Sequence, residues 1–435
     1  MSPPQEAVSA AVTRVARQER GRLVALLAGR FGDLDLADES VQDAFEEALR
    51  TWPERGVPDQ PAAWLMTVAG RKAIDRTRRA ASARRRTLAA APELQLDPPA
   101  YEEAPAMVID QAGIRDDQLR LVLLCCHPAL SPEAQVALTL RLVGGLTTSE
   151  IAAAYVLPEA TVAQRVVRAK RKISAARIPF VIPAAVDDRI EAVLQVLYLV
   201  FNEGYLTHGT TSAASIRVDL TDEAIRLNAL MVELAPDSGE CRGLLALQLF
   251  HRARLAARLD RHGDLVLLDD QDRSRWDLPG IEAANRVLGE ALAARPGPFG
   301  AFTLQAVIAG FHANARTSAD TDWTGIVTAY DQLLALRPSP VVALNRAVAI
   351  AMADGPRVGL RLLEQIEGLE RYHLWQAARA ELMLRAGDPR GAAEAFHRAH
   401  SLATNPAELR HLERRIAALP ELDDDRLLSE TFPPL

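Results

Sequence analysis

Residues Thr147 to Lys172 read Thr-Thr-Ser-Glu-Ile-Ala-Ala-Ala-Tyr-Val-Leu-Pro-Glu-Ala-Thr-Val-Ala-Gln-Arg-Val-Val-Arg-Ala-Lys-Arg-Lys. This pattern predicts two helices joined by a tight turn. Thr148 or Ser149 can cap the first helix, and Pro158 ends it because proline disfavours helical backbone at the preceding residue. Glu159 then places a carboxylate at the positive end of the second helix. Such a unit can offer a rigid helix to the major groove of DNA.

The second helix of this unit has an apolar and a basic side. The residues expected to face inward are Val162, Val166, Val167, Ala169 and Ile173. Those left for solvent or DNA are Thr161, Gln164, Arg165, Arg168, Lys170, Arg171 and Lys172. A solvated basic face on an ordinary helical hairpin is the alternative to DNA binding. If DNA binds here, Gln164, Arg165 and Arg168 are candidates for contact with bases or phosphates.

The charge of the chain is unevenly distributed. Its 435 residues have a net charge of -7, but residues 1–178 carry 24 Lys and Arg against 22 Asp and Glu. The remaining residues carry 26 against 35. A basic patch in the N-terminal part is therefore the electrostatic feature to expect of a DNA binder.

Helical periodicity runs through almost the whole sequence, which predicts an all-α protein of several domains. Two compact helical units are expected at 5–79 and 116–178, joined by an Ala/Pro/Glu-rich linker at 80–115 with some helix in it. Two prolines in residues 178–183 make a stiff joint. Residues 185–435 then form a large helical region.

The C-terminal region has a weak internal repeat. Gly387 lies at an expected turn, and Ala392, Phe396 and Ala399 follow at the small and aromatic positions of a tetratricopeptide-like helix pair. Gly355 lies 32 residues earlier, close to the period of such repeats. Ordinary antiparallel helices can show the same spacing, but several echoes favour a helical-repeat array, which exposes a concave face to partners.

An acidic helix is expected at residues 38–49. Its apolar stripe comprises Val41, Phe45, Ala48 and Leu49, and its other side carries Asp38, Glu39, Gln42, Asp43, Glu46 and Glu47. Most charge runs are solvated faces. The functional alternative is docking onto a basic partner, where complementary charge assists encounter and register.

Two tryptophans, Trp52 and Trp64, flank a proline-rich loop at 53–61. Either can be a core residue, or the two can grip unstacked bases. The helix that follows becomes strongly basic, with eight Lys or Arg residues and one acid between Arg71 and Arg86. Its candidates for salt-sensitive phosphate contact are Arg71, Lys72, Arg76, Arg78 and Arg79.

These elements together resemble the two-domain bacterial sigma factors of the extracytoplasmic-function class. The resemblance covers about residues 10–178, with four elements in the family's order. It implies that Asp38–Leu49 binds the β′ clamp helices of core RNA polymerase, that Trp52–Trp64 melts the −10 element, and that Leu65–Arg79 grips it. It also implies that Thr147–Lys172 reads the −35 element, where this class also contacts the β flap.

Two positions depart from the family pattern. Val156 stands in the helix–turn–helix turn, where the family usually has glycine, and a β-branched residue is poorly suited to positive φ. Arg71 stands where many members have asparagine. The turn geometry and the details of −10 recognition are therefore the points at which the family's properties transfer least securely.

The C-terminal region resembles that of a subgroup with a long tetratricopeptide-like extension, which implies control of sigma activity in cis. The segments that carry this resemblance include 178–180, 201–205, 268–276, 322–323 and 345–349. Two of them could contact the sigma domains, through Asn202, Glu203, Tyr205, Asp270, Asp272, Arg273 and Trp276. A solvated loop and a helix end closed by Gly204 are the alternatives.

Enzymatic and metal-binding motifs are missing from the sequence. There is no phosphate-binding glycine loop, nucleophile elbow or Cys/His metal spacing, and His397 with His400 lacks a third ligand. No cofactor, metal or membrane span is expected, and three cysteines that form no metal or disulfide framework suggest a reducing cytoplasm. We expect a non-catalytic sigma subunit acting with core polymerase on promoter DNA. The alternatives are a free-standing helix–turn–helix regulator with a tetratricopeptide-like sensor, and a scaffold.

Overall fold

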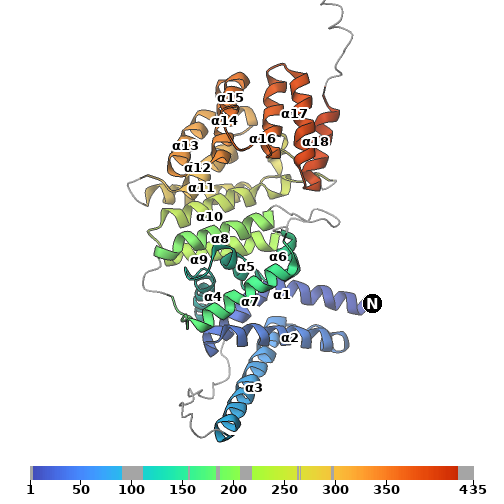
Figure 1. Cartoon of the computed structure of the whole chain (residues 1–435), viewed down its shortest axis with the longest axis vertical. Helices are drawn as coiled ribbons and strands as arrows, with labels where there is room; N and C mark the ends of the chain where they lie inside the picture. Colours follow the sequence, from blue (N-terminus) through green and yellow to red (C-terminus); the bar gives the residue numbers. More distant parts are fainter. Residues whose placement is uncertain are drawn as a thin grey trace, which may run out of the picture. The chain divides into compact units, whose positions relative to one another are not determined.

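The computed structural model describes residues 3–90, 111–154, 157–182, 187–205, 218–261, 264, 266–294 and 298–419. Within these residues every regular element is a helix, so the all-α prediction is confirmed (Figure 1). The chain divides into two compact units. The first contains Met1–Leu206 and Arg217–Ala235, and the second contains Thr207–Ile216 and Pro236–Leu435.

Three packed helices open the first unit: α1 (Pro3–Phe31), α2 (Leu34–Arg55) and α3 (Pro61–Ala90). Gly32, with φ of +65°, makes the turn after α1, in a conformation that costs glycine little. The carboxylate of Asp33 then caps α2 by accepting a hydrogen bond from the Leu36 amide. The α3 helix continues to Ala90, well into the range assigned to the linker.

Four further helices contain the opening motif: α4 (Gln111–Cys125), α5 (Pro132–Leu142), α6 (Thr148–Ala154) and α7 (Glu159–Ala175). The cap of α6 is Thr147, one residue before the predicted Thr148 or Ser149. The Thr147 hydroxyl accepts from the Glu150 amide at 3.1 Å, and the Glu150 carboxylate accepts from the Thr147 amide at 2.8 Å. This reciprocal capping box satisfies two otherwise free amides. The turn at Tyr155 and Val156 lies outside the described residues.

Two apolar side chains that the sequence assigned to buried stripes are exposed. Leu49 is 47% exposed and Val167 is 46% exposed, whereas Ala48 and Val166, one residue earlier, are buried. Successive helical residues point about 100° apart, so a side chain at the edge of a stripe can leave the core. These two burial predictions were wrong, and the other members of both stripes are buried.

The first unit also contains two helices from beyond residue 185, α8 (Asp187–Tyr205) and α9 (Val218–Leu234). They pack against each other; α8 also packs against α4 and α5, and α9 packs against α4. Leu197 and Phe201 of α8 are fully buried, and the Arg189 guanidinium donates to the Leu123 carbonyl at 3.5 Å. The region after residue 185 is therefore split between the two units.

The second unit is a succession of helices: α10 (Gly239–Ala253), α11 (Leu278–Ala293), α12 (Ala301–Asn314), α13 (Trp323–Leu336), α14 (Pro340–Asp354), α15 (Pro356–Leu363), α16 (His373–Arg385), α17 (Pro389–Leu402) and α18 (Pro406–Ala417). Each helix packs against the next along the chain (Figure 1). Gly355 and Gly387 make turns with φ of +101° and +86°, which favour glycine. The predicted repeat positions Ala392, Phe396 and Ala399 are buried in one core cluster.

Candidate polymerase and promoter interface

The acidic side of α2 contains one buried carboxylate. Asp38 is only 8% exposed, and the Arg20 guanidinium of α1 donates to its Oδ1 at 2.5 Å. Burial by itself would raise the pKa of Asp38, but the positive charges of Arg20 and Lys170 outweigh it and hold the pKa below its ordinary value. Asp38 is thus an ionised residue inside the fold, and the reading of it as part of a solvated face was wrong.

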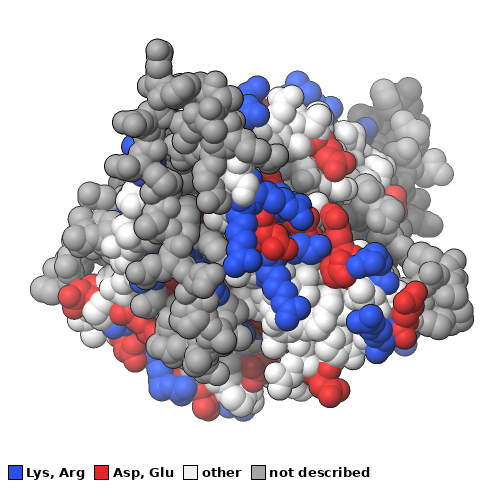
Figure 2. Space-filling view, turned by 90° about the horizontal axis from the view of Figure 1, so that it is seen from below, with Lys and Arg blue, Asp and Glu red and all other residues white. Residues whose placement is uncertain are grey.

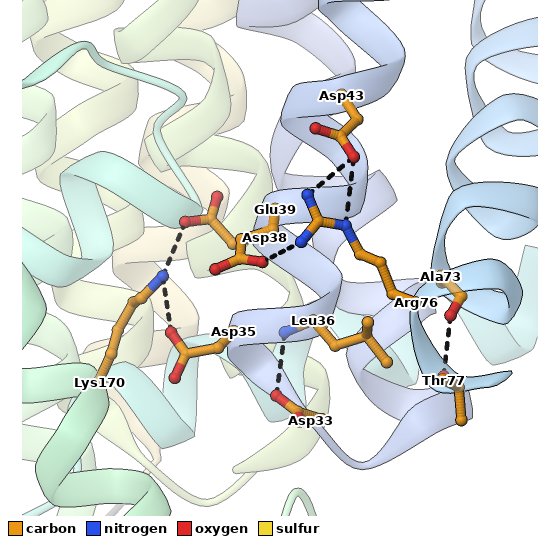
Figure 3. A network of polar contacts seen from close by, with 10 residues as sticks. All are labelled: Asp33, Asp35, Leu36, Asp38, Glu39, Asp43, Ala73, Arg76, Thr77 and Lys170. Carbon is orange, nitrogen blue, oxygen red and sulfur yellow. Dashed lines mark hydrogen bonds and ion pairs between the residues drawn. The ribbon is translucent and has the colours of Figure 1, made fainter. Parts of the chain in front are cut away.

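Lys170 reaches the same carboxylate from α7 (Figure 3). Its Nζ lies 2.8 Å from Asp35 Oδ1 and 3.0 Å from Asp38 Oδ2, and its side chain is 13% exposed. Burial acts to lower the pKa of Lys170, yet the two aspartates prevail and raise it. The sequence left Lys170 for solvent or DNA; in the structure it is largely buried and paired with α2.

Other acids of α2 pair with cations of α3 and of α2 itself. The Arg76 guanidinium donates to Asp43 Oδ2 at 2.9 and 3.2 Å and also to Glu39 (Figure 3). Glu47 pairs with Arg50, and Lys72 Nζ lies 3.9 Å from Glu47 Oε2. Glu39, Gln42 and Glu46 remain exposed, with a 3.2 Å hydrogen bond between the last two.

A cleft of about 1210 Å³ opens between α2, the loop after it and α3. Its lining includes both predicted tryptophans and the basic residues Arg50, Arg55, Arg71, Lys72, Arg76 and Arg79. Acids lie among these cations, and Figure 2 shows Lys and Arg side chains gathered around Asp and Glu on the face seen from below. The surface is therefore a mixed one with a basic rim.

The two tryptophans differ in accessibility. Their ring centroids are 5.5 Å apart in an edge-to-face arrangement, which aromatic pairs favour. Trp52 is 2% exposed and belongs to the core, so it has no free face on which a base could stack. Trp64 is only partly buried, so of the two rings that line the cleft it presents the more accessible surface. Trp52 is therefore a core residue, and of the two rings only Trp64 remains a candidate for contact with a base.

The outer side of α7 is accessible. Gln164, Arg168 and Lys172 are exposed, Thr161 and Arg165 are partly exposed, and Arg168 approaches Gln164 at 3.5 Å. In α6, Thr148 is half-buried and Ser149 is exposed. On α3, Arg71, Arg78 and Arg79 are exposed and Lys72 is partly buried. Both helices therefore present basic side chains to solvent.

Family comparisons agree with this arrangement of helices. A model of sigma-70 region 2 matches residues 15–83, and a model of sigma-70 region 4 matches residues 120–173. The chain belongs to the sigma-70 family. A family of unknown function matches residues 189–292 of the extension.

Two relatives are similar to this sigma factor over different shares of its length. It is 42% identical over 390 residues to an uncharacterized protein of Rhizobium meliloti, covering 89% of this chain and 90% of the relative. It is 32% identical over 171 residues to "Probable ECF RNA polymerase sigma factor SigI" of Mycobacterium tuberculosis, covering 38% of this chain and 56% of that protein. The chain is an extracytoplasmic-function RNA polymerase sigma factor with a C-terminal extension.

The charged cluster of the extension is packed within the second unit of the sigma factor. The Arg273 guanidinium donates to the carbonyls of His312 and Ala315 at 2.9 and 2.7 Å and lies 4.4 Å from the centre of the buried Trp276 ring. Asp272 accepts from the Ser274 amide, while Asp270 is exposed. Asn202 is partly buried in the first unit, and the side chains of Glu203 and Tyr205 lie outside the described residues.

Across the residues that the structure describes, no three His, Cys, Asp or Glu side chains are grouped to hold a metal ion. His400 instead approaches Glu413 at 3.3 Å. No described helix combines the length and apolar character that a membrane span needs.

Sequence reasoning missed Arg20, Asp35 and the pairing of Lys170. A signal for Lys170 exists, because it lies four residues after Val166 and three before Ile173, both on the buried stripe. A lysine at that spacing flanks the core, where its stem can be buried while its ammonium finds a partner. No comparable local signal identifies that partner, since Asp38 is 132 residues away in sequence.

Proposed function

We propose that region 2 of this sigma factor joins the polymerase through the acidic side of α2 and holds the −10 element in the cleft beside α3. Gln42, Glu46 and Glu39, the last already paired with Arg76, supply exposed polar groups for a basic surface such as the β′ clamp helices. Asp38, Asp43 and Glu47 already have cationic partners within the chain. These three carboxylates can bind the polymerase directly only after their ion pairs within the chain are exchanged for contacts with it.

The cleft supports this proposal more than any other feature. Trp64 lines it together with Arg71, Lys72 and Arg79, so an aromatic ring lies beside cations that can neutralise phosphates. An aromatic ring can stack on an unpaired base of any type, and nearby cations can bind the phosphates of the backbone. Trp52 supports Trp64 from the core.

We assign the −35 element to the outer side of α7. Gln164, Arg165 and Arg168 are placed for base or phosphate contacts, and Thr161 and Lys172 for the flanking backbone. Thr148 and Ser149, at the start of α6, can hold a phosphate and so fix the register of the reader helix. The β flap of the polymerase is the proposed protein partner of region 4.

A reconstituted transcription reaction tests the proposal. The purified chain is mixed with sigma-free core polymerase and a set of promoter fragments, and run-off transcripts are measured. Transcripts that require the chain, and that fall when Trp64 is replaced by alanine, support it. Footprints that form without core polymerase would instead support a free-standing regulator and overturn the assignment of α2.

We further propose that the tetratricopeptide-like extension, residues 185–435, controls this activity in cis. Support comes from its succession of packed helices and from the placing of α8 and α9 in the first unit. Two truncations separate the contributions, one after residue 184 and one after Ala235. The longer form keeps the buried residues of α8 and α9 covered. Unchanged promoter-dependent transcription by the longer form would refute control by the second unit.

A further inference from the structure

The segment between α10 and α11 connects the beginning of the second unit with its end (Figure 1). We call its described residues, 254–261, 264 and 266–277, the strap. The middle of the strap contacts α16 and α18, although the strap begins at the end of α10 and leads directly into α11. The residues that meet at α18 lie up to 150 positions apart in sequence. This contact is additional to the packing of each helix against the next.

The base of the strap, where its two ends meet, is fixed by buried groups. Trp276 is 5% exposed, and the guanidinium carbons of Arg273 and Arg254 lie 4.4 and 5.9 Å from its ring centroid. The Asp277 amide donates a hydrogen bond to the Ala253 carbonyl at 2.9 Å, which joins the two ends. These contacts hold the base without help from the middle of the strap.

The middle of the strap is held by arginines of α16 and α18. Arg410 Nε donates to Asp264 Oδ1 at 2.6 Å, and Arg414 donates to Oδ2 of the same carboxylate. The hydrogen bonds from Arg410 and Arg414 hold the pKa of Asp264 below its ordinary value. Arg385 Nη2 lies 3.9 Å from Asp269 Oδ2. Two guanidinium groups therefore share one carboxylate, and a third lies near another carboxylate of the strap.

These ion pairs are accessible to water. The side chains of Arg385, Arg410 and Arg414 are 46–47% exposed. Asp269 is also exposed, and its Oδ1 accepts a hydrogen bond from the Ser318 hydroxyl at 2.6 Å. Ion pairs at such exposure contribute little to stability, so the middle of the strap can leave while the base and the helices stay folded. Its departure would uncover three cations on α16 and α18.

We propose that Arg385, Arg410 and Arg414 form a binding site for a short acidic segment of a partner protein, and that the middle of the strap occupies this site until the partner displaces it. The strap shows the chemistry that the site accepts, because charge-assisted pairing of guanidinium groups with carboxylates is strong and geometrically specific. Helical-repeat arrays commonly use their extended surfaces to bind partners. The site lies within the second unit, so the inference does not depend on the proposed roles of α2 and α7.

A short acidic peptide suits this site better than a nucleic acid does. Residues 179–435 carry 26 Lys and Arg against 35 Asp and Glu. The net negative charge of this region repels a long polyanion, whereas a short segment needs only the local field of three arginines.

The strap competes with any partner as a tethered ligand. A segment attached by a short connection acts at an effective concentration on the order of millimolar. The apparent affinity for a free peptide is lowered by the fraction of molecules in which the site is open. Replacing Asp264 and Asp269 with asparagine removes both carboxylates at nearly unchanged shape, so the open fraction should rise and free peptide should bind at least roughly tenfold more tightly.

A peptide copied from the strap is the probe. A fluorescein-labelled peptide with the sequence of residues 264–272, Asp-Leu-Val-Leu-Leu-Asp-Asp-Gln-Asp, is titrated with the full-length chain, and its fluorescence anisotropy is measured. Asp264→Asn/Asp269→Asn should bind it at least roughly tenfold more tightly than the wild type. Adding Arg410→Gln and Arg414→Gln should abolish this gain. No binding, or equal binding by the two chains, would overturn the proposal, as would a gain that survives the arginine substitutions.

Two controls address charge alone. Asp331→Asn/Asp354→Asn removes the same two charges from α13 and α14 and deprives Arg346 of its partner Asp331, yet it should bind the peptide as the wild type does. A gain in this variant would show that the site is not specific. A labelled short DNA duplex that binds Asp264→Asn/Asp269→Asn more tightly than the peptide, through the same arginines, would make the site one for nucleic acid and overturn the assignment of the partner.

Hydrogen exchange on the wild-type chain tests the displacement without any substitution. The Val266 amide donates to the Arg258 carbonyl at 2.9 Å within the strap, and an isolated turn of this kind is marginally stable in water once its contacts with α18 are lost. Excess peptide should therefore speed exchange at Val266 but not at Asp277 in the base. Faster exchange at both amides would mean that the strap unfolds as a whole, and unchanged exchange at Val266 in the peptide-bound chain would mean that the peptide binds elsewhere. Either result overturns the proposal.

Discussion

The acidic side of α2 and the basic side of α7 are both runs of charge in the sequence, but they differ in the folded chain. On α2, Asp35, Asp38, Asp43 and Glu47 all have cationic partners from the same chain. On α7, the residues proposed to read DNA remain at the surface, and only Lys170 is drawn inward. A run of charge in a sequence therefore says where charge is located, but not whether it is available to a partner.

The difference has an energetic consequence. A charge at the surface contributes little to the free energy of unfolding, so it can pair with a ligand with little loss of stability. A buried charge depends on its partners, because removing one leaves the other without compensation in a poorly solvated site. The α2 side is thus a structural surface as well as the proposed binding surface for the polymerase, whereas the outer side of α7 has only its proposed role in binding DNA. The following variants test that distinction.

Loss of the buried carboxylate should have the largest effect. Asp38→Ala leaves Arg20 buried without its partner and should lower the free energy of unfolding by about 3–5 kcal/mol. Urea denaturation measures this. Glu46→Ala, at an exposed position of the same helix, should change it by less than about 0.5 kcal/mol. Equal effects of the two substitutions would mean that the acidic side is uniform.

Acid should weaken the same pair. The pKa of Asp38 is depressed in the folded chain, so its stabilising contribution is present above the unfolded-state pKa, near 4, and is lost as the pH falls through the folded-state value. The stability difference between the wild type and Asp38→Asn should therefore be constant above about pH 5 and shrink at lower pH. Urea midpoints between pH 2.5 and 7 measure it. A difference that does not change with pH would show that Asp38 is not ionised in the fold.

A surface residue of α7 should affect DNA use rather than stability. Arg165→Ala should weaken promoter-dependent transcription by the equivalent of about 1–3 kcal/mol if it contacts guanine, without altering core binding. Run-off transcription and a core-binding titration measure the two effects. Arg357→Ala, an exposed residue of the extension, removes the same charge and should alter neither. A parallel loss of core binding in Arg165→Ala would count against the assignment.

The smallest expected effects on stability are those of two arginine substitutions in α3. Arg76 pairs with Glu39 and Asp43, and it is 38% exposed, so Arg76→Ala should cost only about 0.5–1 kcal/mol of stability. Arg79→Ala should cost less, because Arg79 is exposed. If both contact phosphates, each variant should reduce the salt dependence of promoter binding by about one ion. If only Arg79→Ala reduces the salt dependence of promoter binding, Arg76 does not contact a phosphate and serves only to pair α3 with α2.

The sequence supported local conclusions best. Periodicity identified the helices, and the buried side of α7 was predicted correctly at Val162, Val166, Ala169 and Ile173. The same reasoning failed at Leu49 and Val167, because periodicity does not fix how wide a buried stripe will be. It also placed the cap of α6 one residue late, since Thr147, Thr148 and Ser149 are all good capping residues.

By itself, the sequence determined the all-α class, the order of the sigma regions and the location of the basic and acidic helices, because these depend on residues close together in the chain. Only the tertiary structure decided that Trp52 is buried in the core while Trp64 stays partly exposed at the cleft, and that Lys170 meets Asp38. Those outcomes depend on contacts between helices far apart in sequence, where burial gives each charge its partner and changes what it can do.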